Sequence, residues 1–284
     1  MDRPSLDLGF DGIHVLITGG SGLIGRVVVD HFLAAGAHVS SLDISYASES
    51  DTQPDISHSA FTAIHCDVSG ETSIQCAFAT ATRTHGPVEV CIALASLDLS
   101  VLTPSSFVNA SLSQLQRVLS INVAGTWLTA REWVRGLEQA KAELKSLKHP
   151  NLIIIGSESG HFGERQNVDY SLAKSAVQGG LLMSLRAEIP RIWTGARVNV
   201  VAPGAVETER WFAECKSKPD QHYLEAQATT ALGEPIPPRA VAMAILALAS
   251  HNFSSHVHGQ IINVDGGKQG KVMWTRQEAD LRRG

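Results

Sequence analysis

The segment "TGGSGLIG", residues 18–25, places four glycines between two apolar stretches. It follows "IHVLIT" (13–18), which predicts a buried strand, and it leads into "LIGRVVVDHFLAAG" (23–36), which has helical periodicity. Its spacing fits both G-x-G-x-x-G and G-x-x-G-x-x-G. Glycines permit a tight turn, and a helix N-terminus presents unpaired N–H groups to phosphates. The segment therefore predicts a pyrophosphate-binding turn made by Gly19, Ser21, Gly22, Leu23, Ile24 and Gly25.

An acidic residue follows at the distance that such a turn requires. Asp43 ends the run "AHVSSLDI" (37–44), about 18 residues after Gly25. A carboxylate there can accept hydrogen bonds from an adenosine ribose 2′-hydroxyl and would repel a 2′-phosphate. No Lys or Arg occurs in 18–25 or 43–50, so NAD is favoured as the cofactor, with NADP as the alternative. A strand–helix turn that binds nothing is the other interpretation of the glycines.

Strand and helix signals alternate along the rest of the chain. Further strands are expected at 61–68, 88–96, 151–157, 196–204 and 259–267, and helices at about 71–85, 111–145, 169–189 and 239–250. Such alternation gives a parallel sheet with helices on both faces. Because no linker or repeat interrupts it, we expect an α/β fold with a single Rossmann-like domain over 1–284, built on a doubly wound parallel seven-stranded sheet.

The composition favours a folded cytoplasmic protein that acts on a small molecule. A chain with 44% hydrophobic and 18% charged residues can bury a large core. A net charge of −5 argues against a nucleic-acid or anionic-membrane partner. No apolar run reaches the roughly 18 residues of a membrane span, and the polar N-terminus "MDRPSLDLGFDG" is unlike a signal peptide.

Neither the cysteines nor the histidines form a recognisable metal-binding or redox motif in the sequence. Four scattered cysteines without a C-x-x-C pair indicate a reducing compartment and no disulfides. The densest group of histidines, "HNFSSHVH" (251–258), lacks the cysteine or carboxylate support of a zinc site and is interpreted as a solvated loop. We therefore expect no metal.

A tyrosine and a lysine share one face of a predicted helix. "YSLAK" places Tyr170 and Lys174 four residues apart, and Ser157 ends the run "NLIIIGS" thirteen residues before the tyrosine. Alone, Y-x-x-x-K is common by chance. Together with the residues above it resembles the short-chain dehydrogenase/reductase family, in its shorter single-domain branch. The likeness also includes "CDV" (66–68), "INVAG" (121–125), "GSESG" (156–160), "RVNVVAPGAVET" (197–208) and "GQIINVDGG" (259–267).

The resemblance implies an NAD(P)-dependent oxidoreductase with four catalytic residues. Tyr170 would exchange a proton with the substrate oxygen, and Lys174 would hold the nicotinamide ribose and lower the pKa of the tyrosine. Nearby positive charge does favour the phenolate of a group whose pKa is otherwise about 10. Ser157 would hydrogen-bond the substrate oxygen. Asn122 would lie at a helix irregularity and hold a water of a proton relay.

The resemblance also implies further contacts and an assembly. Asp67 and Val68 would contact the adenine, and Pro203, Val206 and Thr208 would lie along the nicotinamide and the pyrophosphate. Residues of about 208–235 would form a mobile substrate lid, and 268–284 a polar tail. Family members usually pair through the two long helices, so a homodimer or homotetramer is expected.

Two segments depart from the shorter branch. Leu23 stands where that branch usually has a glycine, and "TGGSGLIG" matches the extended branch instead. After the fourth predicted strand, Ala93-Leu94-Ala95-Ser96 replaces the usual Asn-Asn-Ala-Gly. This loss should weaken one polar bracing network without removing a catalytic group.

The leading hypothesis is interconversion of a secondary alcohol and a ketone. A non-redox isomerase, dehydratase or cyclase could keep the same fold, and a nucleotide-sensing binding protein is a third class. Trp211, Phe212 and Tyr223 in the predicted lid suggest an apolar or ring-bearing substrate, or equally a lid that packs on the core.

Overall fold

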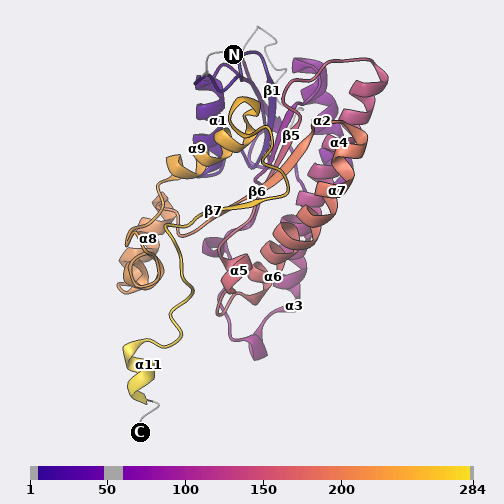
Figure 1. Ribbon diagram of the computed structural model, residues 1–284. Coiled ribbons are helices and arrows are strands. Elements are labelled where there is room, and N and C mark those ends of the chain that lie inside the picture. Colours follow the sequence, from indigo (N-terminus) through magenta and orange to yellow (C-terminus); the bar gives the residue numbers. More distant parts are fainter. Residues whose placement is uncertain (1–5, 48–59, 282–284) are drawn as a thin grey trace.

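The computed structural model describes residues 6–47 and 60–281 and is built on one seven-stranded sheet (Figure 1). The strand order is β3-β2-β1-β4-β5-β6-β7, and every neighbouring pair is parallel. The strands are β1 (His14–Thr18), β2 (His38–Asp43), β3 (Phe61–His65), β4 (Val90–Ala93), β5 (Asn151–Ile155), β6 (Arg197–Pro203) and β7 (Ile261–Val264). The expected doubly wound α/β fold is confirmed.

The central strands of the sheet are covered on both faces. Every residue of β1, β4, β5 and β6 is buried, as in a parallel sheet between two helical layers. The strand order reverses between β1 and β4, which are paired through Thr18 and Ala93 at their carboxyl ends. In open α/β sheets, ligands bind beside the carboxyl ends of the strands at such a reversal.

Helices form one layer on each face of the sheet, as Figure 1 shows. On one side α1 (Gly25–Ala34) packs against α9 (Pro238–Ala249), and Phe32 and Ile245 are fully buried there. On the other side α2 (Glu71–His85) and α4 (Thr126–Ala142) lie together, and Trp133 and Leu137 fill that core. The helix α1 ends where predicted, because Gly36 adopts a φ of +83°.

The two long predicted helices are continuous, but each contains a π-helical turn. The first consists of α3 (Leu112–Val118), the turn η3 (Leu119–Gly125) and α4. The second consists of α6 (Val168–Ala176), the turn η4 (Val177–Leu181) and α7 (Leu182–Ile192). Such turns hold one extra residue and occur often at functional sites. Hydrophobic periodicity alone does not distinguish them from regular helix.

Helix α7 runs two residues past Pro190, whereas the sequence predicted an end at residue 189. Proline lacks the N–H that would bond the carbonyl of Arg186. In its place His258 Nε2 lies 2.8 Å from that carbonyl, while His258 Nδ1 accepts the Val198 N–H at 3.2 Å. The interpretation of 251–258 as a solvated loop was therefore wrong in two respects: residues 251–254 form a short helix, and His258 replaces a missing helical hydrogen bond.

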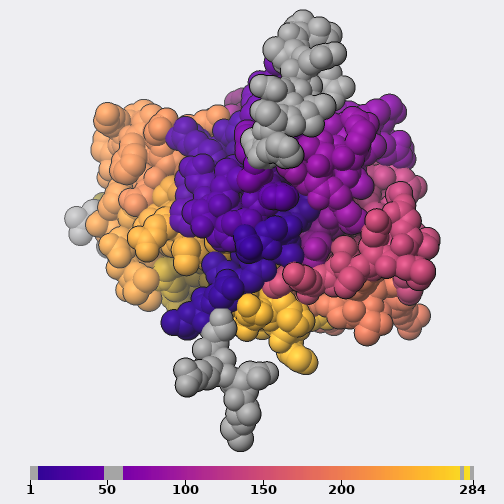
Figure 2. Space-filling model, turned by 90° about the horizontal axis from the view of Figure 1, so that it is seen from above, coloured from indigo at the N-terminus to yellow at the C-terminus, as the bar shows by residue number. Residues whose placement is uncertain are grey.

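The N-terminal residues lie against the segment around residue 250. The Ser250 hydroxyl donates to the Leu8 carbonyl at 2.7 Å, and in Figure 2 the indigo N-terminal residues adjoin yellow-orange ones. After Ser250, α10 (His251–Ser254) forms a short helix, and α11 (Arg276–Leu281) lies at the far end of the chain, away from the sheet (Figure 1).

Two observations on the described residues concern membrane-spanning helices and disulfides. None of their helices is both long and apolar enough to cross a membrane. All four cysteines are described and none is paired, with Cys66 and Cys91 buried.

Candidate active site

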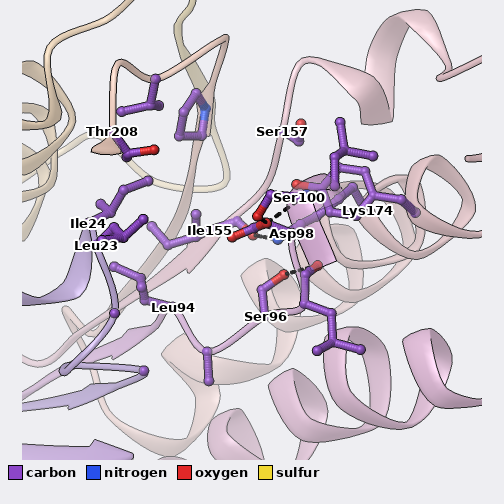
Figure 3. Close-up of a pocket in the computed structure, with 18 of the residues that line it drawn as sticks. Leu23, Ile24, Leu94, Ser96, Asp98, Ser100, Ile155, Ser157, Lys174 and Thr208 are labelled. Carbon is purple, nitrogen blue, oxygen red and sulfur yellow. Dashed lines mark hydrogen bonds between the residues drawn. The ribbon is translucent and has the colours of Figure 1, made fainter. Parts of the chain in front are cut away.

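A cavity of about 480 Å³ opens beside the carboxyl ends of the strands, where the strand order reverses. Figure 3 shows Leu23, Ile24 and Leu94 along one part of it and Ser157 and Lys174 along another. Most of the predicted site residues lie in its wall: Gly19, Gly22, Leu23, Ile24, Asp43, Asp67, Val68, Ser157, Tyr170, Lys174, Pro203, Val206 and Thr208. Ser21, Gly25 and Asn122 do not line it: Ser21 is exposed, and Gly25 and Asn122 are buried.

The glycine turn brings the first strand, the first helix and the loop after β4 into close contact. Gly19 has a φ of +72°, and a Cβ there would lie 2.7 Å from Ala95 Cα. A Cβ on Gly25 would collide with the Gly19 carbonyl oxygen, so this glycine lets α1 close onto β1. At Gly22 a Cβ would meet only the Gly19 oxygen, at 3.2 Å, which leaves its outer face open to the cavity.

Asp43 links the glycine turn to the end of β2. Its carboxylate accepts the Ser21 N–H at 3.2 Å and the Ser45 N–H at 3.0 Å. Burial raises the pKa of Asp43, but these hydrogen bonds outweigh burial and hold it below its ordinary value. Ser21 thus positions the carboxylate, and Asp43 presents a charged acceptor to the cavity.

Three further predicted contact residues, Asp67, Val68 and Thr208, line the cavity and are fixed by local contacts. At one end Asp67 accepts the Ser69 N–H at 2.9 Å, and Val68 packs so closely on Gly125 that a Cβ there would lie 2.8 Å from Val68 Cγ2. Beyond β6, Thr208 caps helix α8 (Glu209–Ser217) by accepting the Trp211 N–H at 3.3 Å.

Ser157 is held by a residue that the sequence analysis did not single out. Its N–H donates to Gln178 Oε1 at 3.0 Å, and its hydroxyl accepts the Ser159 N–H at 3.1 Å. A Cβ on Gly156 or Gly160 would collide with the amide of Gln178. Gln178 lies one helical turn after Lys174 on the same face, which is the only sequence signal that could have indicated it.

Tyr170 and Lys174 are both buried in the cavity wall. The Lys174 ammonium donates to the Ile155 carbonyl at 3.0 Å and lies 5.7 Å from the centre of the Tyr170 ring. Burial lowers the pKa of Lys174 to about 8. The serine, the tyrosine and the lysine therefore share one water-poor region, in which charge effects are strong.

The surroundings of Tyr170 disfavour its phenolate. Burial raises its pKa well above 10, a hydrogen bond with Ser157 lowers it, and the carboxylates of Asp98, Glu164 and Glu158 raise it further. Burial and the nearby carboxylates thus oppose ionisation of Tyr170, and the hydrogen bond with Ser157 favours it. Additional positive charge beside the ring would be needed to make the tyrosine a base near neutral pH.

Asn122 lies in the π-helical turn η3, as the predicted helix irregularity suggested. Its Oδ1 accepts the Leu97 N–H at 2.8 Å, and its Nδ2 donates to the Leu97 carbonyl at 2.9 Å. Both polar atoms of the amide therefore hold the loop after β4, which carries Leu94 and Asp98 into the cavity wall.

The residues above match a known family over most of the chain. Residues 21–269 match the family described as enoyl-(acyl carrier protein) reductase. The carbonyl reductase family member 4 of Danio rerio is 30% identical over 255 residues, which cover 89% of this chain and 97% of that protein.

The chain belongs to the short-chain dehydrogenase/reductase family. The 3-oxoacyl-[acyl-carrier-protein] reductase MabA of Mycobacterium bovis is 26% identical over 253 residues, covering 89% of this chain and 91% of MabA. The crystal structure of gox2181 superposes with a TM-score of 0.77 at 25% identity, covering 92% of this chain and 96% of that one. Members of this oxidoreductase family use NAD(P).

Where this chain departs from the short-chain dehydrogenase/reductase pattern after β4, the loop is held through its backbone. The Thr18 hydroxyl accepts the N–H groups of Leu94 and Ala95, at 3.1 and 3.2 Å, and Leu94 packs against the core. The loop after β4 thus has both polar and apolar contacts without the two asparagines. The strand expected over 88–96 ends at Ala93 because the following residues turn toward Thr18.

The aromatic side chains of the segment after β6 have different positions. Trp211 is buried in the cavity wall, whereas Phe212 and Tyr223 are exposed and do not line the cavity. In the described part of the chain, no group of three or more His, Cys, Asp or Glu residues could hold a metal ion.

Proposed function

We propose that this protein is an NAD-dependent oxidoreductase that interconverts a secondary alcohol and a ketone, with Tyr170 as general acid and base. The proposal rests on one observation: Ser157, Tyr170 and Lys174 line the same cavity as the glycine turn. Bound in that cavity, the nicotinamide would supply or accept the hydride. Family membership supports the reaction class.

The protein residues supply the proton transfer and the orientation. In the oxidative direction Tyr170 takes the proton of the substrate hydroxyl, and in the reductive direction it returns one. Ser157, fixed by Gln178, donates a hydrogen bond to the same oxygen. The Lys174 ammonium, 5.7 Å from the centre of the Tyr170 ring, would act together with the positive charge of the oxidised nicotinamide against the carboxylates that raise the pKa of Tyr170. Asn122 acts on the loop after β4, and its predicted part in a proton relay stays a prediction.

The choice of NAD rests on Asp43. Its carboxylate is ionised and lies in the cavity wall at the end of β2. A second anion, such as a ribose 2′-phosphate, would be repelled there, whereas a 2′-hydroxyl could donate to it. The glycine turn fits a dinucleotide, because Gly22 leaves the helix N-terminus open to the cavity.

The test is a screen of secondary alcohols and ketones with NAD(H) and NADP(H), followed at the nicotinamide absorbance. The Tyr170→Phe variant should lose turnover by at least about a thousandfold, in the range of general acid–base catalysis, and should still bind NAD. Retained turnover in that variant would refute the mechanism. Substrate conversion without an absorbance change would favour an isomerase, dehydratase or cyclase, and tight NAD binding without any turnover would favour a sensor.

The segment 208–235 would serve as a substrate lid. Arg26 of α1 pairs with Glu209 at 2.9 Å, and Arg210 pairs with Asp98 at 3.2 Å, so α8 is held to two sides of the cavity. Exposed ion pairs contribute at most about 1 kcal/mol each, so these two pairs add little to the cost of opening. That cost lies in the burial of Trp211 and in the contacts of Glu225 with Lys268 and Lys271. Hydrogen exchange of 208–235 should slow when NAD and substrate are added. Unchanged exchange would argue against a lid.

A homodimer or homotetramer would bury the outer faces of the two long helices. Trp127, Leu172 and Met183 expose apolar surface on α4, α6 and α7. Light scattering should give a multiple of 30.4 kDa, and Leu172→Glu should shift it toward the monomer. A monomer at assay concentration would contradict this assembly.

A further inference from the structure

The segment that follows β7 brings two lysines into contact with the cavity wall. Lys271 Nζ lies 2.9 Å from Glu158 Oε1, 2.9 Å from Glu164 Oε2 and 3.0 Å from Glu225 Oε2. Lys268 Nζ lies 3.3 Å from the same oxygens of Glu158 and Glu225, and 2.9 Å from the Glu225 carbonyl. We call Glu158, Glu164, Glu225, Lys268 and Lys271 the charged wall.

The lysines of the charged wall have no donor left for a ligand. An ammonium group has three N–H donors, and each lysine has three oxygens within 3.3 Å. Lys268 is also completely buried. Carboxylates, in contrast, accept several hydrogen bonds each. The wall therefore offers acceptors rather than donors, and its three carboxylates outnumber its two cations.

Two buried polar atoms in the cavity wall lack a partner in the described part of the chain. One is Glu158 Oε2, an acceptor on a side chain that is 6% exposed, and the other is Trp211 Nε1, a donor. A buried polar atom without a hydrogen bond costs about 1–3 kcal/mol. Both atoms have almost no accessible surface, so each would gain a hydrogen bond when its side chain turns toward a ligand group. A hydroxyl can both donate and accept, whereas an ammonium only donates and a carboxylate only accepts.

The wider charge distribution disfavours an anion in the same place. Apart from the acids on the cofactor side, the wall of the cavity carries five carboxylates and three cations: Asp98, Glu158, Glu164, Glu214 and Glu225 against Lys174, Arg210 and Lys271. Three of these carboxylates act on the Tyr170 phenol, so the negative field reaches the reacting oxygen. An anionic group bound beside Tyr170 would be repelled.

We propose that the charged wall selects a neutral alcohol that carries a second hydroxyl beside the reacting carbon, and rejects carboxylates and phosphates. Glu158 accepts from that second hydroxyl, and Lys268 and Lys271 position Glu158 from the C-terminal segment. The proposal rests on the proposed oxidoreductase function and adds its substrate class. It also assigns the tail a role in specificity, through residues that the sequence analysis did not single out.

The experiment compares four alcohols of the same carbon count, namely butane-2,3-diol, butan-2-ol, 3-amino-2-butanol and 3-hydroxybutanoate. The diol should exceed the mono-alcohol in kcat/KM by about tenfold or more, since a hydrogen bond to a charged group has at least that value. The hydroxy acid should be the poorest of the four. Equal values for diol and mono-alcohol, or a preference for the hydroxy acid or the amino alcohol, would overturn the proposal.

Variants separate the charged wall from general effects. Glu158→Gln should reduce the diol to mono-alcohol ratio about tenfold, and Glu164→Gln should weaken the rejection of the hydroxy acid if the first variant fails to fold. Asp30→Asn is the matched control, because Asp30 is exposed on α1 and does not line the cavity, and its ratio should be unchanged. A diol to mono-alcohol ratio that does not move in Glu158→Gln, or a rejection of the hydroxy acid that does not weaken in Glu164→Gln, would overturn the assignment.

Failure of the proposed function has a different signature. If none of the four alcohols is turned over, binding to the NAD-loaded Tyr170→Phe variant is measured by calorimetry. Tighter binding of the diol than of the other three would support the charged wall even without the reaction. Absent binding, or equal binding of all four, would overturn it.

Discussion

Replacing Gly19 by alanine tests whether the glycine turn is fixed by its contact with the loop after β4. Gly19 has a φ of +72°, and a Cβ would lie 2.7 Å from Ala95 Cα and 2.9 Å from Ala95 N. The left-handed backbone costs about 1–2 kcal/mol for a residue with a Cβ. Forcing an extra carbon into a tight contact costs about 1–3 kcal/mol. Gly19→Ala should therefore lower the free energy of unfolding by about 2–5 kcal/mol.

Gly12→Ala is the matched control for this substitution. Gly12 has a φ of +69°, but a Cβ there would meet nothing within 4 Å. The Gly12→Ala variant should lose only the backbone contribution to its unfolding free energy, about 1–2 kcal/mol. The change in the entropy of the unfolded state is common to both variants. The difference between the two variants thus isolates the contact with Ala95, at about 1–3 kcal/mol.

The assay is urea unfolding followed by tryptophan fluorescence, with NAD affinity measured in parallel. Gly19→Ala should also weaken NAD binding, because Ala95 lies in the cavity wall and must shift. Equal unfolding free energies for the two alanine variants would refute the contact argument. A large loss of stability with unchanged NAD affinity would refute the assignment of this turn to the cofactor.

Three further outcomes are expected. Burial lowers the pKa of His14 to about 4, so the unfolded chain binds more protons than the folded chain between about pH 6.5 and 4. The free energy of unfolding should therefore fall by up to about 3 kcal/mol as the pH falls through that window. A His14→Gln variant whose unfolding free energy changes with pH in the same way would contradict this. His258→Ala should lower the unfolding free energy by about 1–3 kcal/mol, because the Arg186 carbonyl and the Val198 N–H lose their partner, and unchanged stability in urea would show that water replaces the ring. Asp43→Asn should reduce the preference for NAD over NADP about tenfold by removing the charge, measured as the ratio of kcat/KM values, and an unaltered ratio would assign the preference to other residues.

The strand and helix order could be predicted because each element has its own periodicity and its own termination signal. Gly36 ends α1 as expected, and the strand ends deliver Asp43 and Ser157 to the same edge of the sheet. Chain order and the parallel topology were sufficient to bring these residues together. Spacing on a helix likewise predicted that Tyr170 and Lys174 face the same cavity.

The remaining parts of the site depend on contacts between distant segments. Lys271 meets Glu158 across 113 residues of chain, and no local pattern marks either residue. His258 appeared to belong to a polar loop because the missing donor at Pro190 becomes visible only when the two segments are adjacent. The absence of the asparagines after β4 could be predicted from the sequence, but the hydrogen bonds of the Thr18 hydroxyl with Leu94 and Ala95 could not.

The two π-helical turns restrict the length of the helices that contain them. Each turn presents one amide side chain toward the end of a neighbouring strand: Asn122 toward Leu97 after β4, and Gln178 toward Ser157 after β5. Deleting one residue from 119–125 or 177–181 would allow regular α-helix to form, but it would rotate the following residues by about 100° relative to those before. The amide would then leave its loop while the helix itself remained intact. Insertions and deletions should accordingly be tolerated in surface loops and excluded from these two turns, so that helical register, rather than helix stability, limits how this active site can vary.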